Sequence, residues 1–219
     1  MSDNKTTSSA SDVKKPRPGP PVLGLLGAPG SGKSHVARLW QDMGAAVIDA
    51  DEIARKVLDE PEVRGTLAKW WGAGVLSADG EVDRAAVGAR VFDDPGELAR
   101  LESLVHPRVN ARRAELRRLY QADPAVTAIV EDCPLLLERE LDGDCDVLVF
   151  VDTPRETRVA RVAQARGWSA QDLDRREKNQ LPLDIKRARA DYILNNDADP
   201  SAVQTQARQL LDRVSSKKS

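Results

Sequence analysis

Residues 27–34 read GAPGSGKS and fit the spacing GxxxxGK[ST], in which each fixed position has a chemical task. Glycines carry no Cβ, so the backbone of this loop can aim several N–H groups into one concavity that fits phosphate oxygens. Lys33 adds a positive charge for the β and γ phosphates, and the Ser34 hydroxyl is placed to ligate Mg²⁺. The pattern predicts a site for a nucleotide phosphate, and the alternative interpretation is an ordinary glycine-rich turn between a strand and a helix.

Carboxylates follow two other apolar segments. Asp49 and Asp51 end the second segment, and ligands of open parallel sheets bind outside the carboxyl ends of the strands. One carboxylate would orient an attacking hydroxyl and take its proton, while the other would help to hold Mg²⁺ through water. The alternative is that one of them only caps the next helix, which is compatible with catalysis by the other. Asp132 ends AIVED (128–132), which resembles the acidic Walker B strand of ATPases.

The elements that must position these residues alternate between short apolar segments and helical ones. Strands separated by helices pair in parallel, so the sequence predicts an α/β protein with a helix-covered parallel sheet. The first helix is expected over 33–43, with Gly44 as its stop. Five strands are expected, at 22–26, 46–48, 125–130, 147–151 and 192–194.

The spacing of the strands is uneven. Residues 51–123 are helical in pattern and far longer than one crossover needs, so we expect a helical insertion there. Residues 155–190 are rich in Arg and Lys and are expected to form a lid over the nucleotide; a solvated helix face with i,i+4 ion pairs is the alternative. The remaining divisions are a tail at 1–20, a kinase domain at 21–213 with its core at 21–50, 124–154 and 191–213, and a flexible end at 214–219.

Composition excludes several classes of protein. A chain of 219 residues that is 41% hydrophobic and 31% charged is ordinary for a globular enzyme. Its net charge of −2 favours neither nucleic acid nor a membrane surface as a partner. No apolar stretch reaches the ~18 residues of a membrane span, and no signal peptide is visible. Cys133 and Cys145 lack metal-ligand spacing and are expected to be free thiols in a reducing cytoplasm.

Six segments together resemble the dephospho-coenzyme A kinase family. They are GxxGSGKS in the loop, VIDADEIAR at 47–55, VFDD at 91–94, LVHPRV at 104–109, DCPLLLE at 132–138 and LPLDIKRARADYILNND at 181–197. They occur in the family's order, and the resemblance covers roughly residues 22–213. It implies a three-layer P-loop kinase fold with a five-stranded parallel sheet, a helical substrate-binding insertion and a helical lid. It also implies that the γ-phosphate of ATP is transferred to the 3′-hydroxyl of dephospho-coenzyme A, with Mg²⁺.

The resemblance also implies roles for individual residues. Asp51 matches the family's catalytic base, and Arg176 matches the lid arginine because it stands four residues before Gln180, as in RxxxQ. His106 and Arg108, at an HPR turn of the insertion, would lie near the acceptor. The expected catalytic set is Asp51, Lys33 and Arg176. The expected ATP-binding set is Gly30, Ser31, Gly32, Lys33, Ser34, His35, Arg176 and Asn196, with Asn196 at the adenine. The expected acceptor-binding set is Asp49, Asp51, His106, Arg108 and Asp132, and Mg²⁺ would be held by Ser34 with Asp49 through water.

The loop departs from the family's usual TGGIGSGKST. Leu26, Ala28, Pro29 and His35 replace Thr, Gly, Ile and Thr. Pro29 removes one N–H donor, and His35 replaces a hydroxyl near the α-phosphate with an imidazole. These changes bear on ATP affinity and on nucleotide preference.

Two other functions remain open at this stage. One is a kinase of the nucleoside monophosphate type, which would share the loop and the lid. The other is a non-catalytic nucleotide-binding module, which the acidic strand end at Asp132 favours and the absence of an NKxD motif disfavours. The chain is expected to act as a monomer or a weak homo-oligomer.

Overall fold

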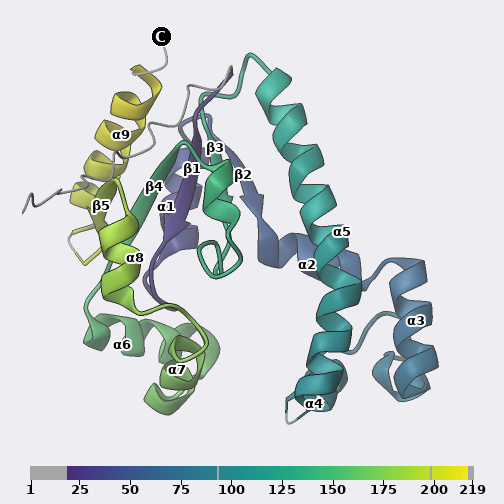
Figure 1. Ribbon diagram of the computed structural model, residues 1–219. Coiled ribbons are helices and arrows are strands. Elements are labelled where there is room, and N and C mark those ends of the chain that lie inside the picture. Colours follow the sequence, from purple (N-terminus) through teal and green to yellow (C-terminus); the bar gives the residue numbers. More distant parts are fainter. Residues whose placement is uncertain (1–18, 93, 198, 217–219) are drawn as a thin grey trace, which may run out of the picture.

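The computed structural model describes residues 19–92, 94–197 and 199–216 (Figure 1). Most of the expected N-terminal tail, residues 1–18, lies outside the described residues, as do residues 217–219. In the described part, the strands form one parallel sheet in the order β2-β3-β1-β4-β5, which confirms the five-stranded parallel sheet. The strands are β1 (Val22–Leu26), β2 (Ala46–Asp49), β3 (Ile129–Asp132), β4 (Val147–Asp152) and β5 (Tyr192–Asn195).

Helices cover both faces of this sheet. Alternate residues of β1 enter different hydrophobic clusters: Val22 and Leu26 belong to one, Leu23 and Leu25 to the other. The second cluster lies under α1 (Lys33–Gln41) and α9 (Pro200–Ser216). These two helices are joined by a hydrogen bond, in which Nε1 of Trp40 on α1 donates to the carbonyl of Ala207 on α9 at 2.8 Å. The first cluster packs against α8 (Leu183–Arg189) and extends into the insertion. A strand buried on both faces explains why the strand segments read as continuous apolar runs.

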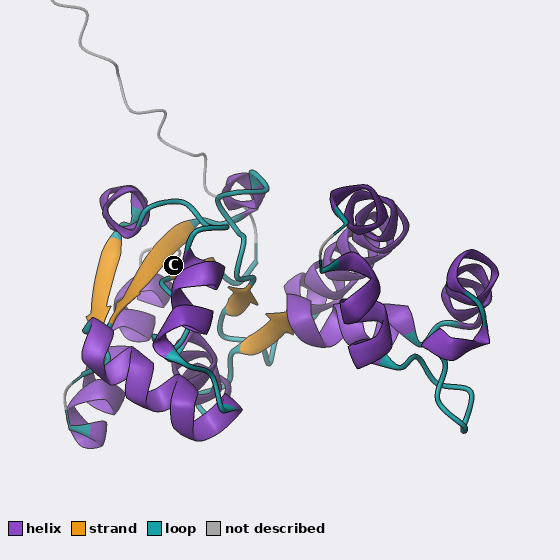
Figure 2. Cartoon of the chain, turned by 90° about the horizontal axis from the view of Figure 1, so that it is seen from below, coloured by secondary structure: helices purple, strands orange, loops and turns teal. Residues whose placement is uncertain are grey.

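The insertion follows the carboxyl end of β2 and stands to one side of the sheet (Figure 2). Its core consists of aliphatic side chains such as Val63, Leu67 and Val105. Trp70 and Trp71 are partly buried against this core, and the Trp71 indole donates to Glu97 at 2.6 Å. The elements are α2 (Ala50–Leu58), α3 (Pro61–Trp71), η1 (Ala73–Val75), α4 (Arg84–Val91) and the 28-residue α5 (Pro95–Ala122).

Helix α5 connects the insertion to the sheet through a buried ion-pair cluster. Glu131 of β3 is 0% exposed, and its two carboxylate oxygens accept hydrogen bonds from Arg113 and Arg117 of α5. Arg117 also contacts Asp144 of η2 (Leu141–Asp144) at 2.8 Å. A buried carboxylate is tolerable only when its oxygens are paired in this way, so the cluster fixes the helix against the strand.

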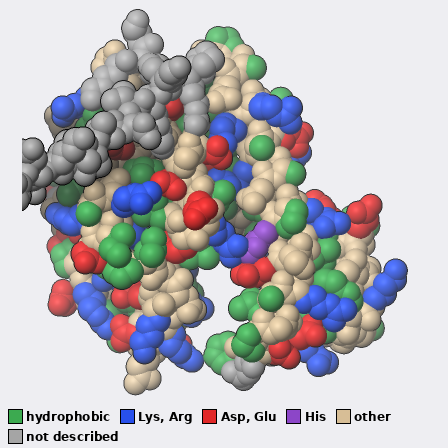
Figure 3. All heavy atoms as spheres, viewed as in Figure 1, with side chains coloured by type: hydrophobic (Ala, Val, Ile, Leu, Met, Phe, Trp, Pro, Cys, Tyr) green, Lys and Arg blue, Asp and Glu red, His purple; other side chains and the backbone are tan. Residues whose placement is uncertain are grey.

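The lid follows the carboxyl end of β4, so it rises from the same sheet edge as the insertion (Figure 1). It consists of α6 (Arg155–Arg166) and α7 (Ala170–Glu177) and returns to the sheet through α8. Buried Lys186 of α8 pairs with Glu138 at 2.8 Å and donates to Gln180 at 2.8 Å, which ties the returning chain to the segment after β3. In the space-filling view the molecule is hollowed between the lid and the insertion (Figure 3).

Several expected boundaries shift. Strand β3 begins at Ile129 rather than at 125 and continues to Asp132, because Glu131 is neutralised inside the fold. Helix α1 ends at Gln41, two residues earlier than expected, and Gly44 follows in the turn with a φ of 94°. The HPR segment is no turn, since Pro107 lies inside continuous α5. Helix α9 extends to Ser216, so the expected flexible end is helical in its first three residues.

Within the described residues, no helix combines the length and the apolar character needed to cross a membrane.

Candidate active site

The phosphate loop joins β1 to α1 at the carboxyl edge of the sheet. Gly32 precedes the helix with a φ of 87°, and a Cβ at this position would lie 2.1 Å from the Asn196 amide nitrogen. Only glycine therefore allows both the left-handed turn and the close approach of the chain after β5. The Asn196 amide donates to the carbonyl of Ser31 at 2.7 Å, and Thr153 donates to the same oxygen at 2.9 Å. Two remote segments thus hold the loop in shape.

Lys33 folds back over this loop. Its ammonium donates to the carbonyls of Gly27 and Ala28, at 2.9 and 3.0 Å. Burial lowers the pKa of Lys33 to about 8, although Asp132 and Asp51 act in the opposite direction. Within the described part of the chain, Lys33 forms no ion pair with a carboxylate, so its charge remains available to an anion.

The two aspartates at the end of β2 lie in different surroundings. Asp49 is the N-cap of α2 and accepts the backbone N–H of Glu52 at 2.9 Å. Asp51 lies in the first turn of that helix and lines a cavity between the sheet edge and α5. Loss of water around its carboxylate raises the pKa of Asp51, and the charge of Asp49 raises it further, while Arg55, Arg166 and Lys33 oppose the shift. A carboxylate with an elevated pKa beside cations is a candidate proton acceptor.

Ser34 and Asp132 meet at the start of α1. The Ser34 hydroxyl donates to the Asp132 carboxylate at 2.8 Å, across 98 positions of sequence. Burial raises the pKa of Asp132, although this hydrogen bond and the charge of Lys33 oppose the shift. The pair offers two hard oxygen donors, whereas the described residues contain no group of three or more His, Cys, Asp or Glu that could hold a metal ion. Such a sparse donor set fits Mg²⁺, which takes one or two protein ligands and completes its shell with phosphates and water.

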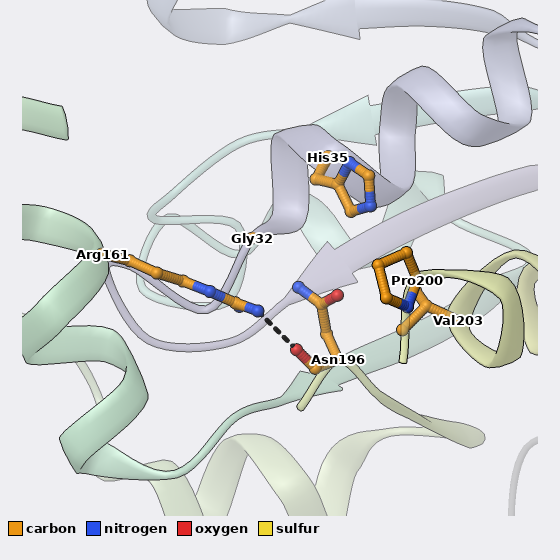
Figure 4. Close-up of a pocket in the computed structure, with 6 residues that line it drawn as sticks. All are labelled: Gly32, His35, Arg161, Asn196, Pro200 and Val203. Carbon is orange, nitrogen blue, oxygen red and sulfur yellow. Dashed lines mark hydrogen bonds between the residues drawn. The ribbon is translucent and has the colours of Figure 1, made fainter. Parts of the chain in front are cut away.

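A first cavity of about 260 Å³ lies beside the helix start (Figure 4). Arg161 donates to the Asn196 carbonyl at 2.9 Å, and its other terminal nitrogen is buried without a hydrogen-bond partner. Burial and the charges of Arg38 and Arg161 lower the pKa of His35, so its imidazole is neutral at pH 7. The lining residues are Gly32, His35, Arg161, Asn196, Pro200 and Val203.

A second cavity, of about 200 Å³, lies between Asp51 and α5. His106 lines it, and its Nδ1 is 2.8 Å from Arg139, which can only donate; the ring therefore carries its proton on Nε2. Burial and the Arg139 charge lower the pKa of His106. Arg108 does not line this cavity and instead reaches Glu60 and Glu62 of the α2–α3 region, at 3.7 and 3.6 Å. The structure thus brings Asp51 and His106 together and leaves Arg108 outside.

Arg176 lies in the lid, where its guanidinium is 3.8 Å from the centroid of the Trp168 ring. Arg166 stacks on the same ring at 4.7 Å, and its charge acts on the pKa of both Lys33 and Asp51. The sequence interpretation missed Arg166, Arg161 and Arg139, because nothing in their local pattern separates them from solvated arginines. Their placement depends on contacts with distant elements.

Comparison with known proteins gives these features a context. The family model described as "Dephospho-CoA kinase" matches residues 21–201. A dephospho-CoA kinase of Deinococcus radiodurans is 39% identical over 203 residues, which cover 89% of this chain and 94% of that protein. A dephospho-CoA kinase of Thermobifida fusca is 43% identical over 176 residues, which cover 80% and 86% of the two chains.

Solved structures show the same fold. A crystal structure from Thermus thermophilus superimposes with a TM-score of 0.73 at 31% identity, covering 89% of this chain and 98% of the other. The dephospho-CoA kinase of Campylobacter jejuni, at 23% identity, has a TM-score of 0.65 and covers 89% and 97%.

Proposed function

The chain belongs to the dephospho-CoA kinase family, and on that premise we propose how its residues transfer the γ-phosphate of ATP to the 3′-hydroxyl of dephospho-CoA. The observation that carries the proposal is the position of Asp51. Its carboxylate lines the second cavity and is close enough to Lys33 for each charge to act on the pKa of the other. A carboxylate that could take a proton therefore lies between the phosphate loop and a separate cavity that could receive dephospho-CoA.

The ATP side is assigned to the loop and the first cavity. Loop amides and the helix dipole of α1 would receive the phosphates, and the Lys33 ammonium would exchange its two carbonyl partners for phosphate oxygens. The base would occupy the cavity between His35 and Asn196, beside the unpartnered Arg161 nitrogen. Asn196 holds Ser31 with its amide nitrogen, so its contact with the base would use the amide oxygen.

Mg²⁺ would be held by the Ser34 hydroxyl and the Asp132 carboxylate, directly or through water. When bound, it neutralises charge on the β and γ phosphates. This assignment moves Asp132 from the acceptor-binding role expected from the sequence to the metal, and it leaves Asp49 as the cap of α2. Asp49 still influences the site through its charge, since it raises the pKa of both Asp51 and Asp132.

The acceptor would enter the second cavity with its ribose hydroxyl against the Asp51 carboxylate. Asp51 aligns the hydroxyl and receives its proton as the phosphorus–oxygen bond forms, while Lys33 and the lid arginines balance the charge of the leaving ADP. Closure of the lid across the hollow excludes water, which would otherwise compete as the acceptor. His106 of α5 and Arg139 of the segment after β3 supply polar groups to this cavity.

A coupled assay of ADP release tests the function. ATP with Mg²⁺ should give ADP at a rate that depends on dephospho-CoA, and AMP or CMP offered at the same concentration should give none above background. Acceptor-dependent release with AMP or CMP would instead support a nucleoside monophosphate kinase. ATP binding without acceptor-dependent release would indicate a non-catalytic module.

The cellular context is part of the same proposal. Cys133 and Cys145 are both buried, and no disulfide joins them, which suits a reducing cytoplasm. We propose a monomer or weak homo-oligomer there, which size-exclusion chromatography with light scattering can test.

A further inference from the structure

The arginines of the lid fall into two groups. Helices α6 and α7 carry Arg155, Arg158, Arg161, Arg166, Arg175 and Arg176. Three of them pair with carboxylates inside the lid: Arg155 with Asp174, Arg158 with Glu177 and Arg175 with Asp172. Arg161 donates to the Asn196 carbonyl. Among these helices' arginines, only Arg166 and Arg176 have neither a carboxylate nor a carbonyl partner, and both stack on Trp168.

The position of Trp168 is fixed by the connection between the two helices. Gly167 ends α6 in a left-handed conformation with a φ of 66°, and the Trp168 N–H donates to the Val162 carbonyl at 3.3 Å. Ser169 then starts α7 with a capping box that involves Asp172. Trp168 therefore lies at the junction of α6 and α7 and receives one arginine from each, with guanidinium-to-centroid distances of 4.7 and 3.8 Å.

We propose that Trp168 is a positioning residue for the phosphoryl transfer, which holds Arg166 and Arg176 against one ring while leaving both charges available to the phosphates. The physical basis is the geometry of the guanidinium group. A carboxylate bonds to the N–H edge that phosphate recognition needs, whereas an aromatic ring covers only the flat face. Stacking thus limits the motion of two long side chains without consuming their donors.

The charge of Arg166 supports this arrangement. It acts on the pKa of both Lys33 and Asp51, so this member of the stacked pair is close enough to influence the reacting centre. Two arginines held in advance at this junction lose less side-chain entropy on binding phosphate than two free ones. The benefit should appear in the transition state, where the transferred group is surrounded by cations.

The inference rests on the proposed function, and the test separates the two. Wild-type turnover with dephospho-CoA tests the function, whereas the ratios of kcat between Trp168 variants test the positioning role of Trp168. Trp168→Leu should lower kcat about two- to thirty-fold, the range that a cation–π contact spans, while KM for dephospho-CoA stays unchanged. Trp168→Phe should recover most of the loss. Trp168→Met, which fills the space without an aromatic face, should behave like the leucine variant; wild-type kcat in Trp168→Met would overturn the proposal.

A double-mutant cycle distinguishes positioning from packing. In the Arg166→Gln/Arg176→Gln background, Trp168→Leu should cause no further loss of kcat, because the groups that it positions are gone. An equal loss in both backgrounds would contradict the proposal. Trp70→Leu is the matched control, because Trp70 also stacks with an arginine, Arg100 at 4.0 Å, but does so in the insertion. That variant should retain kcat whatever its effect on stability.

Discussion

The two cavities beside the phosphate loop are built by different means. The nucleotide-side cavity is lined by residues from α1, α6 and the chain around β5 and α9, and main-chain carbonyls fix its polar groups, as with Asn196 on Ser31 and Arg161 on Asn196. The acceptor-side cavity is lined by residues from α2, α5 and the segment after β3, and its polar residues include three with charged side chains, Asp51, Arg113 and Arg139. In the first cavity the polar side chains are anchored on main-chain carbonyls, whereas in the second Arg113 and Arg139 are bonded to other side chains.

This difference indicates where specificity and chemistry reside. A cavity fixed by backbone atoms changes little when one side chain is replaced, so nucleotide binding should be robust. A cavity defined by charged side chains depends on each of them, so acceptor use and rate should be sensitive. Four experiments test this contrast.

Asp51→Asn should lower kcat about 10²- to 10⁴-fold, or roughly 3 to 5 kcal/mol of barrier, because the amide cannot take the ribose proton. ATP should still bind, which calorimetry can measure beside the steady-state rate. The neighbouring exposed Glu52, whose ion pair within the described part of the chain is with Lys56, provides the control. Glu52→Gln should retain turnover, and near-normal turnover by Asp51→Asn would remove Asp51 from this role.

The affinity for ATP should fall as the pH rises through about 8, because burial sets the pKa of free Lys33 there. Bound phosphates raise the pKa of the ammonium, so binding takes up a proton at alkaline pH. Between pH 7 and pH 9 the charged fraction of free Lys33 falls about tenfold, and the affinity should weaken by up to that factor. Calorimetry at several pH values measures this. Lys33→Met should bind weakly with no such pH dependence, and an equally steep dependence in that variant would assign the effect to another group.

Asp132→Asn should lower activity at limiting Mg²⁺ yet raise the melting temperature at pH 7. The folded-state pKa of Asp132 lies above its unfolded value, so the group contributes stability at acid pH that is lost as the pH rises through the folded pKa. Asparagine removes the charge and keeps an acceptor for Ser34. Each kcal/mol regained corresponds to about 2 to 4 °C in a protein of this size, and the difference should vanish below pH 4.

Asp212→Asn is the matched control for that measurement, because Asp212 is an exposed aspartate on α9. Its melting temperature should equal that of the wild type at both pH values. A lower melting temperature for Asp132→Asn at pH 7 would show that the ionised carboxylate stabilises the fold.

His35→Thr should have the smallest effect, a change in KM for ATP within about threefold, comparable to one weak contact. The His35 imidazole is neutral at pH 7 and lines one wall of the cavity, while backbone contacts hold the rest. KM values for ATP and GTP, compared between wild type and variant, measure this. A larger change, or a switch in nucleotide preference, would show that this cavity too depends on its side chains.

The local motifs of the site could be predicted from the sequence, and the contacts between distant segments could not. Lys33 and Ser34 were recognisable because glycines at fixed spacing allow only a few backbone paths. The parallel sheet was recognisable because its strands are apolar and separated by helices. The N-cap role of Asp49 remained one of two interpretations, since a capping aspartate and a catalytic one look alike in sequence.

Other features depend on tertiary contacts. Glu131 lies beyond the strand end expected at residue 130, yet it belongs to β3 and is fully buried, because Arg113 and Arg117, one helical turn apart on α5, donate to its carboxylate. An acid inside an apolar segment, with two arginines four positions apart upstream, was the available signal. No comparable signal existed for Arg139, whose position becomes meaningful only beside His106.

The buried ion-pair cluster of Glu131, Arg113 and Arg117 should constrain how the sequence changes during evolution. Removing one member of a buried ion pair leaves an uncompensated charge and typically costs about 3 to 5 kcal/mol, a large share of a domain's stability. Glu131, Arg113 and Arg117 should therefore change together or not at all among relatives of this chain. The next residue, Asp132, is the one proposed to bind the metal at the end of β3. The cluster would therefore keep α5, and the acceptor cavity that α5 lines, at a constant position relative to the metal site during evolution.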